Sequence, residues 1–337
     1  LNIILIIVTS RTSVTIKELL NLNFRTNIQL KKECNQIDYS SNLVLIGSCF
    51  SENISKKLDY YKFKTFSNPF GILFNPIAIE TLISNAIHKK EYSEKDIFLL
   101  NERWHCFDAH SDLSDATKSN LLTNLNTSIT TTHKKIAKAS HLIITLGTAW
   151  VYRNNETAKI VGNCHKIPQK KFSKEMLSVE EIVVSLKNIC ALIKSINPKI
   201  NIIFTVSPVR HLKDGFVENM QSKAHLLTAI HQFICSQNKA EVHYFPSYEI
   251  MLDDLRDYRF YNNDMLHPNE TAINYIWGQF KHAWINDNTT SPMKEINVIQ
   301  KGLAHKPFNP NSEQHQQFLE NLNQKIKSLE KQLDIQF

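Results

Sequence analysis

Three short and nearly continuous apolar runs place the strongest constraint on how this chain of 337 residues folds. They cover residues 43–46, 142–146 and 200–206, and each is followed at once by a glycine or a serine. Weaker runs of the same kind cover residues 62–66 and 242–245. Apolar runs that do not alternate with polar residues are typical of strands buried on both faces of a parallel sheet.

Amphipathic helical patterns lie between these runs. We expect helices over residues 51–59, 76–89, 119–139, 178–196, 216–236 and 271–284. The fourth begins with a Ser-x-x-Glu capping box, Ser178 and Glu181. Strands that alternate with helices predict an α/β fold with a mainly parallel sheet. The polar and aromatic segments 98–114 and 154–172 are expected to be long loops or small hairpins at its edge.

The composition excludes several classes of protein. Apolar residues make up 42% and charged residues 21%, which is ordinary for a globular chain with a core. The net charge of +7 is spread over short lysine pairs without a nucleic-acid-binding motif, so we expect no nucleic-acid partner. Only seven residues are glycine, and none are spaced as in a dinucleotide-binding loop or a P-loop, so no cofactor is expected.

The six cysteines are scattered, and none forms a CxxC pair. This pattern disfavours a zinc ribbon or a disulfide scaffold and fits a reducing compartment. The apolar run at residues 3–8 is too short to span a bilayer and lacks the preceding basic residues of a signal peptide. We therefore predict a cytoplasmic protein without a membrane span, a degraded export signal being the alternative.

Residues 313–337 form a helical pattern with leucine and isoleucine in a 3-4-3-4 spacing. The spacing extends over barely two heptads. We expect this helix to pack on its own domain, and a homodimer contact through it is the alternative.

A serine lies at the point where the first apolar run ends, in Gly47-Ser48-Cys49-Phe50. Ligands of open α/β sheets bind outside the carboxyl ends of the strands. A serine between a strand end and a helix start suits a nucleophile whose own backbone N–H stabilises an oxyanion. The simpler interpretation is that Ser48 only caps the helix.

Near the other end of the domain, Asp264 and His267 stand three residues apart, just before Pro268 and a helix. A carboxylate in this position can hold the imidazole tautomer and leave Nε2 free to act as a base. The alternative is an ordinary polar turn at a helix start. The strand-end serine together with this Asp-x-x-His-Pro segment is much more specific than either half.

The segment Gly47 to Phe50, followed by Ser51, resembles the signature of the GSCFA family, which is similar to the SGNH/GDSL group of esterases and lipases. Several further segments support the resemblance in the same order: 24–26, 68–72 with 75–76, Trp104 with 110–111, 147–152, 163–166, 207–211, 256–261 and 264–268. The resemblance implies a three-layer α/β/α sandwich of flavodoxin-like kind over residues 24–290. Residues 1–23 would be an N-terminal extension, and residues 291–337 a C-terminal helical segment packing on the domain or on a partner.

The resemblance also implies a catalytic triad of Ser48, Asp264 and His267, with an oxyanion hole built from the backbone N–H groups of Ser48 and Gly71. A third donor, usually an Asn, is missing, because Ala149 stands in its place. Loss of one such donor commonly lowers the rate by about 10²–10³-fold. We expect Asn163 to replace it, with His165 as a second candidate and Asn68 in reserve.

Six polar or aromatic residues near these motifs are candidates for substrate contacts: Asn68, His110, Trp150, His165, Arg210 and His211. The alternative for the three histidines, zinc ligation, matches no known ligand spacing, so no metal is expected. Cys49, beside Ser48, is interpreted as a small buried thiol rather than as the nucleophile.

The sequence therefore predicts a serine esterase that forms an acyl-enzyme on a small ester, with an acylated carbohydrate as the substrate class. An acyltransferase, in which a glycan hydroxyl replaces water, is one alternative. A non-catalytic carbohydrate-binding protein on the same scaffold is the other.

Overall fold

Five parallel strands form the centre of the molecule. The computed structural model describes residues 26–236 and 241–337. The strand order is β2-β1-β5-β9-β10, and every neighbouring pair is parallel. The strands are β1 (Asn42–Gly47), β2 (Lys64–Ser67), β5 (His141–Leu146), β9 (Asn201–Val206) and β10 (Val242–Phe245). All five predicted strands, and the α/β class with a parallel sheet, are confirmed.

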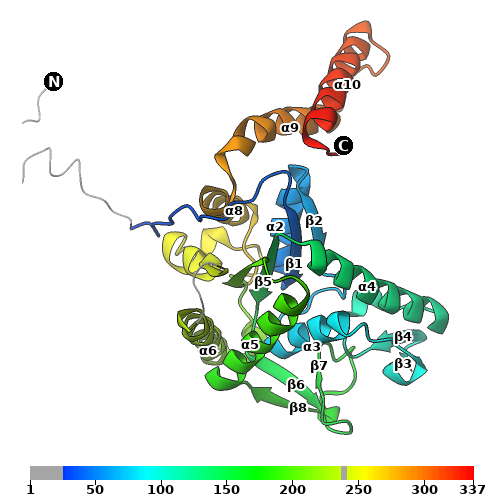
Figure 1. Cartoon of the computed structure of the whole chain (residues 1–337), viewed down its shortest axis with the longest axis vertical. Coiled ribbons are helices and arrows are strands. Elements are labelled where there is room, and N and C mark those ends of the chain that lie inside the picture. Colours follow the sequence, from blue (N-terminus) through cyan, green and yellow to red (C-terminus); the bar gives the residue numbers. More distant parts are fainter. Residues whose placement is uncertain (1–25, 237–240) are drawn as a thin grey trace, which may run out of the picture.

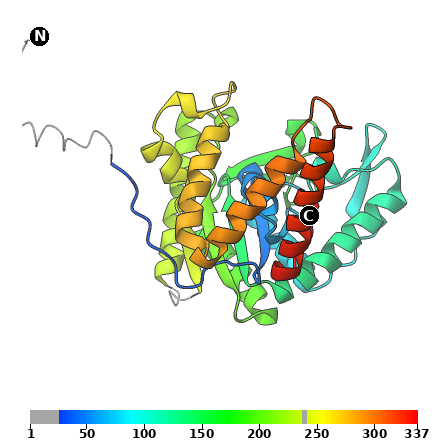
Figure 2. The same ribbon diagram turned by 90° about the horizontal axis from the view of Figure 1, so that it is seen from above.

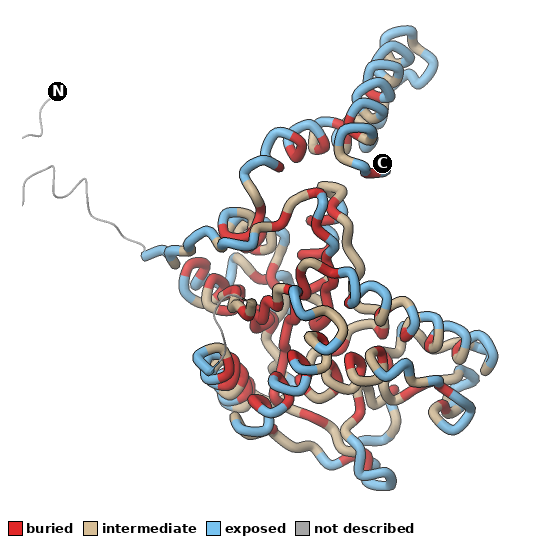
Figure 3. Tube along the Cα trace, in the orientation of Figure 1, coloured by how far each residue is buried: buried red, intermediate tan, exposed pale blue. Residues whose placement is uncertain are grey.

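Helices cover both faces of this sheet, which makes three layers (Figures 1 and 2). Val44 and Ile46 of β1 pack in a first core with α3 (Pro76–Ile87), α4 (Lys118–Lys138), α5 (Val179–Ile196) and α6 (Phe216–Cys235). Leu43 and Leu45 point to the other face and pack in a second core with α2 (Cys49–Tyr60), α8 (Glu270–Trp284), α9 (Thr290–Leu303) and α10 (Glu313–Leu333). The two cores explain why the strands read as continuous apolar runs, and Figure 3 shows the buried residues concentrated there.

Local signals account for the helix boundaries. Ser48 caps α2, so this helix begins two residues earlier than predicted. Asn75 caps α3 with Pro76 in the first turn, and the predicted capping box of Ser178 and Glu181 opens α5. Short elements complete the fold: α7 (Ser247–Glu249), a π-helical turn (Ile250–Asp254) and 3₁₀ turns at Glu94–Asp96, Ser111–Leu113, Gln169–Lys171, Leu212–Asp214, Tyr258–Phe260 and Asp287–Thr289.

Two small antiparallel sheets flank the main one. A hairpin joins β3 (Ile97–Leu100) to β4 (Arg103–Cys106) through Asn101 and Glu102, both at positive φ as a two-residue turn requires. The other sheet pairs β6 (Trp150–Asn154) with β7 (Ile160–Val161) and β8 (Phe172–Met176). The hairpin is one of the two forms predicted for segment 98–114, whereas the three-stranded sheet is more regular than predicted for segment 154–172.

The last two helices, α9 and α10, lie at one end of the molecule (orange and red in Figures 1 and 2). Leu322 and Leu329 of α10 are buried in the second core of the same chain. The 1–23 extension predicted from the sequence lies outside the described residues. Within the part that the structure describes, no helix is long and apolar enough to cross a membrane.

Candidate active site

Ser48 lies at the carboxyl end of β1, beside β5. The strand order reverses at this pair of strands, which is the position where open α/β sheets bind ligands. Gly47 precedes it at φ +147°, and a Cβ there would lie 2.3 Å from the Thr145 carbonyl oxygen of β5. The chain can therefore make this turn against β5 only with glycine, and the turn delivers Ser48 to the first position before α2.

Two hydrogen bonds define the conformation of Ser48, which is only 2% exposed. Its Oγ accepts from the Phe50 N–H at 3.3 Å, as an N-cap does. Its backbone N–H, predicted as an oxyanion donor, donates to the Thr145 carbonyl at 3.1 Å. The hydroxyl hydrogen of Ser48 stays available, because this Oγ acts as an acceptor in the cap.

Asp264 and His267 form the predicted pair in the loop before α8. Asp264 Oδ2 lies 2.7 Å from His267 Nδ1, and Asp264 Oδ1 accepts from the backbone N–H groups of Leu266 at 2.9 Å and His267 at 3.0 Å. These hydrogen bonds, led by that from the His267 backbone, lower the pKa of Asp264 to about 2. The ionised carboxylate holds a proton on Nδ1 and leaves Nε2 as the basic nitrogen.

The loop that carries this pair is held on the end of β9 by Arg210. The Arg210 backbone N–H donates to the Leu266 carbonyl at 3.1 Å. Its guanidinium lies 4.9 Å from the ring centre of Tyr258 and 4.2 Å from that of Tyr261. These contacts anchor the loop that carries Asp264 and His267, and the substrate contact predicted for Arg210 stays a prediction.

Ser48 follows β1, and the loop of His267 is bonded to Arg210 in the loop after β9; β5 lies between these two strands. No hydrogen bond joins Ser48 Oγ to His267 in the described part of the chain. A reaction through this triad therefore requires the Ser48 side chain to turn from the Phe50 N–H toward His267 Nε2.

Asn68 and Gly71 build the neighbouring turn after β2. Asn68 Oδ1 accepts from the Gly47 N–H at 2.9 Å, and its Nδ2 donates to Glu52 Oε1 at 3.3 Å. The Gly71 N–H donates to the Asn68 carbonyl at 2.8 Å. Gly71 has φ +71°, and a Cβ there would lie 2.5 Å from the His110 Cβ. Asn68 thus braces the Ser48 turn, and the N–H predicted as the second oxyanion donor is engaged within its own turn.

Asn163 and His165 differ in what they can offer a ligand. Asn163 Oδ1 accepts from the His165 N–H at 2.8 Å, and its Nδ2 has no partner among residues 26–236 and 241–337. His165 is buried, and its ring bonds the Cys106 carbonyl at 2.7 Å and Ser111 Oγ at 3.1 Å. Burial lowers the pKa of His165 to about 4. His165 is thus a neutral support for the loop, and the Asn163 amide is the freer donor.

Five of the predicted residues line one pocket of about 450 Å³: His110, Trp150, Asn163, His165 and His211. Phe74, Tyr152 and Phe172 add further aromatic surface. The residues of the proposed triad are not part of its lining. A larger hollow of about 630 Å³ lies between α3 and α5 and contains none of the predicted site residues.

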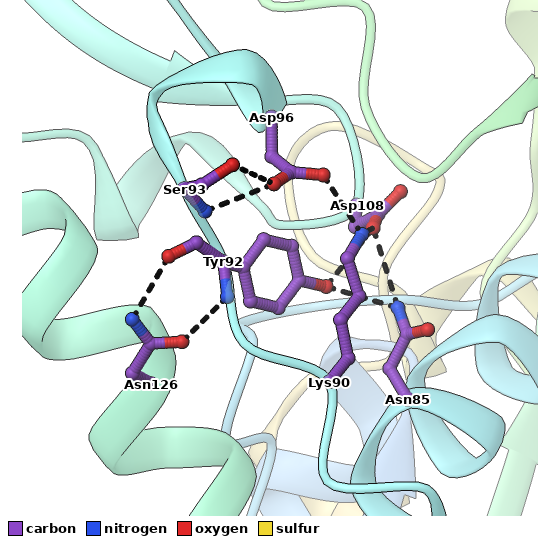
Figure 4. Close-up of polar contacts among 7 residues, drawn as sticks. All are labelled: Asn85, Lys90, Tyr92, Ser93, Asp96, Asp108 and Asn126. Atoms are coloured by element: carbon purple, nitrogen blue, oxygen red, sulfur yellow. Dashed lines mark hydrogen bonds and ion pairs between the residues drawn. The ribbon is translucent and has the colours of Figure 1, made fainter.

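A polar cluster surrounds Asp108, which follows Phe107 in the chain (Figure 4). Asp108 Oδ2 accepts from the Tyr92 hydroxyl at 2.9 Å and from Lys90 Nζ at 3.2 Å. The adjoining Phe107 carbonyl accepts from the backbone N–H groups of Gly162 at 2.8 Å and Asn163 at 3.3 Å. The cluster thereby fixes the segment on which the Asn163 loop rests.

Three buried polar residues of α6 were missed in the sequence: Asn219, Ser222 and Lys223. Ser222 Oγ accepts from the Ala149 N–H at 2.7 Å, and the Ala149 side chain is wholly buried in the first core. The position where an Asn donor is usual is therefore occupied by an alanine side chain packed in the core. The helical spacing could have identified two of them, because Asn219 and Lys223 continue the stripe of buried residues in which Leu226 and Ile230 lie.

Neither Cys49 nor a metal stands out as a reactive centre. Burial, followed by the nearby Glu52 carboxylate, raises the pKa of the Cys49 thiol, which disfavours the thiolate. In the described ranges, no three His, Cys, Asp or Glu side chains are grouped as metal ligands.

Comparison with known proteins gives a family and a distant structural likeness. The model of the GSCFA family matches residues 42–280, and a model described as the C-terminal domain of GSCFA domain proteins matches residues 296–337. No curated protein matches the chain. An acetyl xylan esterase from the rumen bacterium Butyrivibrio proteoclasticus is similar with a TM-score of 0.32 and 10% identity over 80% of this chain. The match spans 66% of that esterase, slightly less than two thirds of its length, and likeness at this level carries no inference about activity.

Proposed function

We propose that this chain, which belongs to the GSCFA family, is a serine hydrolase that acts on small esters through an acyl-enzyme. The observation that carries the proposal is the 2.7 Å bond between Asp264 and His267 Nδ1, at the sheet edge where Ser48 opens α2. A neutral imidazole whose Nδ1 proton is held by a carboxylate is a general base at Nε2.

In the proposed reaction, Ser48 Oγ attacks the ester carbonyl carbon while His267 Nε2 takes the hydroxyl proton. The tetrahedral intermediate collapses as the C–O bond to the alcohol breaks, and His267 returns the proton to the leaving oxygen. Water then attacks the acyl-enzyme with His267 again as the base, which releases the acid and restores Ser48. Asp264 stays ionised throughout and stabilises the imidazolium.

The aromatic pocket that His110, Trp150, Asn163, His165 and His211 line supports an acylated carbohydrate as the substrate class. Trp150 and Tyr152 offer ring surface, and the free Nδ2 of Asn163 offers a hydrogen-bond donor to a hydroxyl or carbonyl oxygen. In this proposal Asn163 also supplies the third oxyanion donor, together with the backbone of Ser48 and Gly71. Those two N–H groups must leave their present acceptors, Thr145 and Asn68, to take part.

One observation favours the non-catalytic alternative. Both backbone donors of the proposed oxyanion hole are bonded inside the protein, and Ala149 is buried. A carbohydrate-binding protein needs the aromatic pocket and does not need these donors. An acyltransferase uses the same acyl-enzyme, and a glycan acceptor that diverts product from the free acid to the acylated glycan would identify it.

Labelling by a fluorophosphonate probe separates the catalytic and non-catalytic proposals. We expect the wild-type protein to be labelled at Ser48 and to hydrolyse p-nitrophenyl acetate. Ser48→Ala should remove the label and lower turnover by about 10³-fold or more. Ser51→Ala is the matched control, because Ser51 is equally buried in α2 and its Oγ has no partner in the described structure. Turnover that survives in Ser48→Ala contradicts the mechanism, and a wild-type protein that binds sugars without labelling supports the alternative.

A further inference from the structure

One face of α6 bonds two loops near the proposed site, the loop after β5 and the loop after β9. This polar face consists of Asn219, Ser222 and Lys223, each at most 5% exposed. Asn219 Oδ1 accepts from the His211 N–H at 2.9 Å in the loop after β9. Ser222 Oγ lies 2.9 Å from Thr148 Oγ1 in the loop after β5. A helix that bonds both loops can set their separation.

Lys223 makes the connection between the two loops directly. Its Nζ donates to the Gly147 carbonyl after β5 at 2.6 Å and to the Ser207 carbonyl after β9 at 2.8 Å. The side chain is fully buried, and its ammonium lies 5.5 Å from the ring centre of Tyr248. Among the described residues, no carboxylate forms an ion pair with it.

Such a residue calls for an explanation beyond packing. Burial of an ammonium group without an ionic partner costs free energy, which its two hydrogen bonds to backbone carbonyls offset only in part. The lysine stem continues the buried stripe of α6, so the ammonium group is the feature to be explained.

The surroundings of this ammonium connect it with the proposed nucleophile. The titratable residues near it are Cys49 of α2, His211 after β9 and Tyr248 of α7, whose ring faces the ammonium group. Cys49 directly follows Ser48. Burial lowers the pKa of His211 to about 3, with a smaller contribution from the Lys223 charge, so this imidazole stays neutral. Of these groups, Lys223 is therefore the one that carries a positive charge, and it does so below about pH 7.

We propose that Lys223 is a positioning residue for the proposed reaction, one that ties the loops after β5 and β9 together and places a buried positive charge next to the N-terminus of α2. The inference rests on the proposed function. The unpaired N–H groups at the start of a helix favour negative charge, and a fixed cation in a medium of low dielectric strengthens that preference. The oxyanion formed on Ser48 attack develops there, which would offset the donor that Ala149 lacks.

The wild-type pH profile provides the first test. Burial lowers the pKa of Lys223 to about 7, so the ammonium loses its proton as the pH rises above neutrality. With p-nitrophenyl acetate as the substrate, we expect kcat to fall on the alkaline side while KM changes little. A kcat that reaches a plateau and holds it from pH 7 to 10 contradicts the proposal, and this measurement needs no variant.

Two substitutions sharpen the test. Lys223→Met keeps the apolar stem and removes the charge, so kcat below pH 7 should fall by about 10²-fold and the alkaline limb should disappear. Lys223→Arg should restore part of kcat and move the alkaline limb beyond the measured range, because a guanidinium stays protonated. Lys194→Met, at a partly exposed lysine of α5 that bonds Glu241, is the control and should match the wild type.

The outcomes separate this inference from the proposed function. Folded Lys223→Met with wild-type kcat and the wild-type alkaline limb overturns the role of Lys223. In that case fluorophosphonate labelling of Ser48 shows whether the hydrolase proposal still stands. A wild-type protein that neither turns over the ester nor is labelled overturns the proposed function itself, and the role of Lys223 falls with it.

Discussion

At the scale of single residues, the proposed chemistry depends on the tautomer of His267. Asp264 is half-exposed, yet three hydrogen bonds from its own loop keep it ionised. The sequence predicted this pair because an i, i+3 spacing before a helix brings carboxylate and imidazole together within a single turn. The orientation of Ser48 was not predictable, because it depends on whether Oγ accepts from Phe50 or donates to His267.

Asp264→Asn tests the tautomer. An amide oxygen cannot stabilise the imidazolium, and the amide NH₂ can donate to Nδ1 and so favour the wrong tautomer. We expect kcat/KM for p-nitrophenyl acetate to fall by about 10⁴-fold. The melting temperature should change little, since the asparagine keeps an oxygen that can accept from the Leu266 and His267 backbone N–H groups. Asp257→Asn is the control, because Asp257 caps the Arg259 N–H in the preceding turn and should leave kcat/KM unchanged. Equal losses in both variants would show that only the loop conformation matters.

At the scale of elements, the strands were predicted well and the small sheet was not. A strand buried on both faces leaves a continuous apolar signal, whereas β6, β7 and β8 are short, partly exposed and paired with one another across loops. Helix α9 lies almost wholly within residues 291–337, which were predicted as a C-terminal helical segment, although its own bounds were not predicted. The glycine after the first apolar run correctly indicated a tight turn at the strand end, since Gly47 lies against the backbone of β5.

Gly47→Ala and Gly278→Ala should change stability in opposite directions. At Gly47 the positive φ and the 2.3 Å approach to Thr145 O force β1 away from β5, so we expect the free energy of unfolding to fall by about 3 kcal/mol. At Gly278, within α8, a Cβ meets nothing within 4 Å, so alanine should raise it by about 0.5–1 kcal/mol. Urea denaturation followed by circular dichroism measures both. A stable Gly47→Ala protein would contradict the close register of β1 and β5.

At the scale of the whole molecule, the sheet separates two cores, and the proposed site lies at the carboxyl edge of the sheet between them. Lys223 reaches this edge from the first core, whereas Ser48 reaches it from α2 of the second. The C-terminal helix α10 closes the far end of the second core with Leu322 and Leu329. Packing on its own chain accounts for the apolar spacing of α10. A homodimer stays a prediction, which a measurement of the mass of the protein in solution would test.

The buried Lys223 should also appear in the pH dependence of stability. Its pKa is about 7 in the folded protein and about 10.5 when unfolded, so the unfolded chain binds more protons between these values. The contribution of Lys223 therefore makes the free energy of unfolding rise with pH from about 7 to 10.5. Burial raises the pKa values of Cys106 and Cys190 to about 12, which makes the free energy of unfolding fall with pH at high pH. This contribution is the same in the wild type and in Lys223→Met. The difference between wild type and Lys223→Met isolates the lysine, and a difference independent of pH would contradict its depressed pKa.

The sequence by itself determined the α/β class, the five strands, most helices and the separate parts of the candidate site. These features depend on local patterns, namely apolar runs, caps and a short Asp-x-x-His spacing, which are readable along the chain. Only the tertiary structure decided that Lys223 bonds the loops after β5 and β9, that His165 supports a loop while Asn163 Nδ2 has no partner among the described residues, and that Ala149 is buried. These outcomes depend on partners up to 76 positions apart, whose hydrogen bonds and burial exist only after the sheet has assembled.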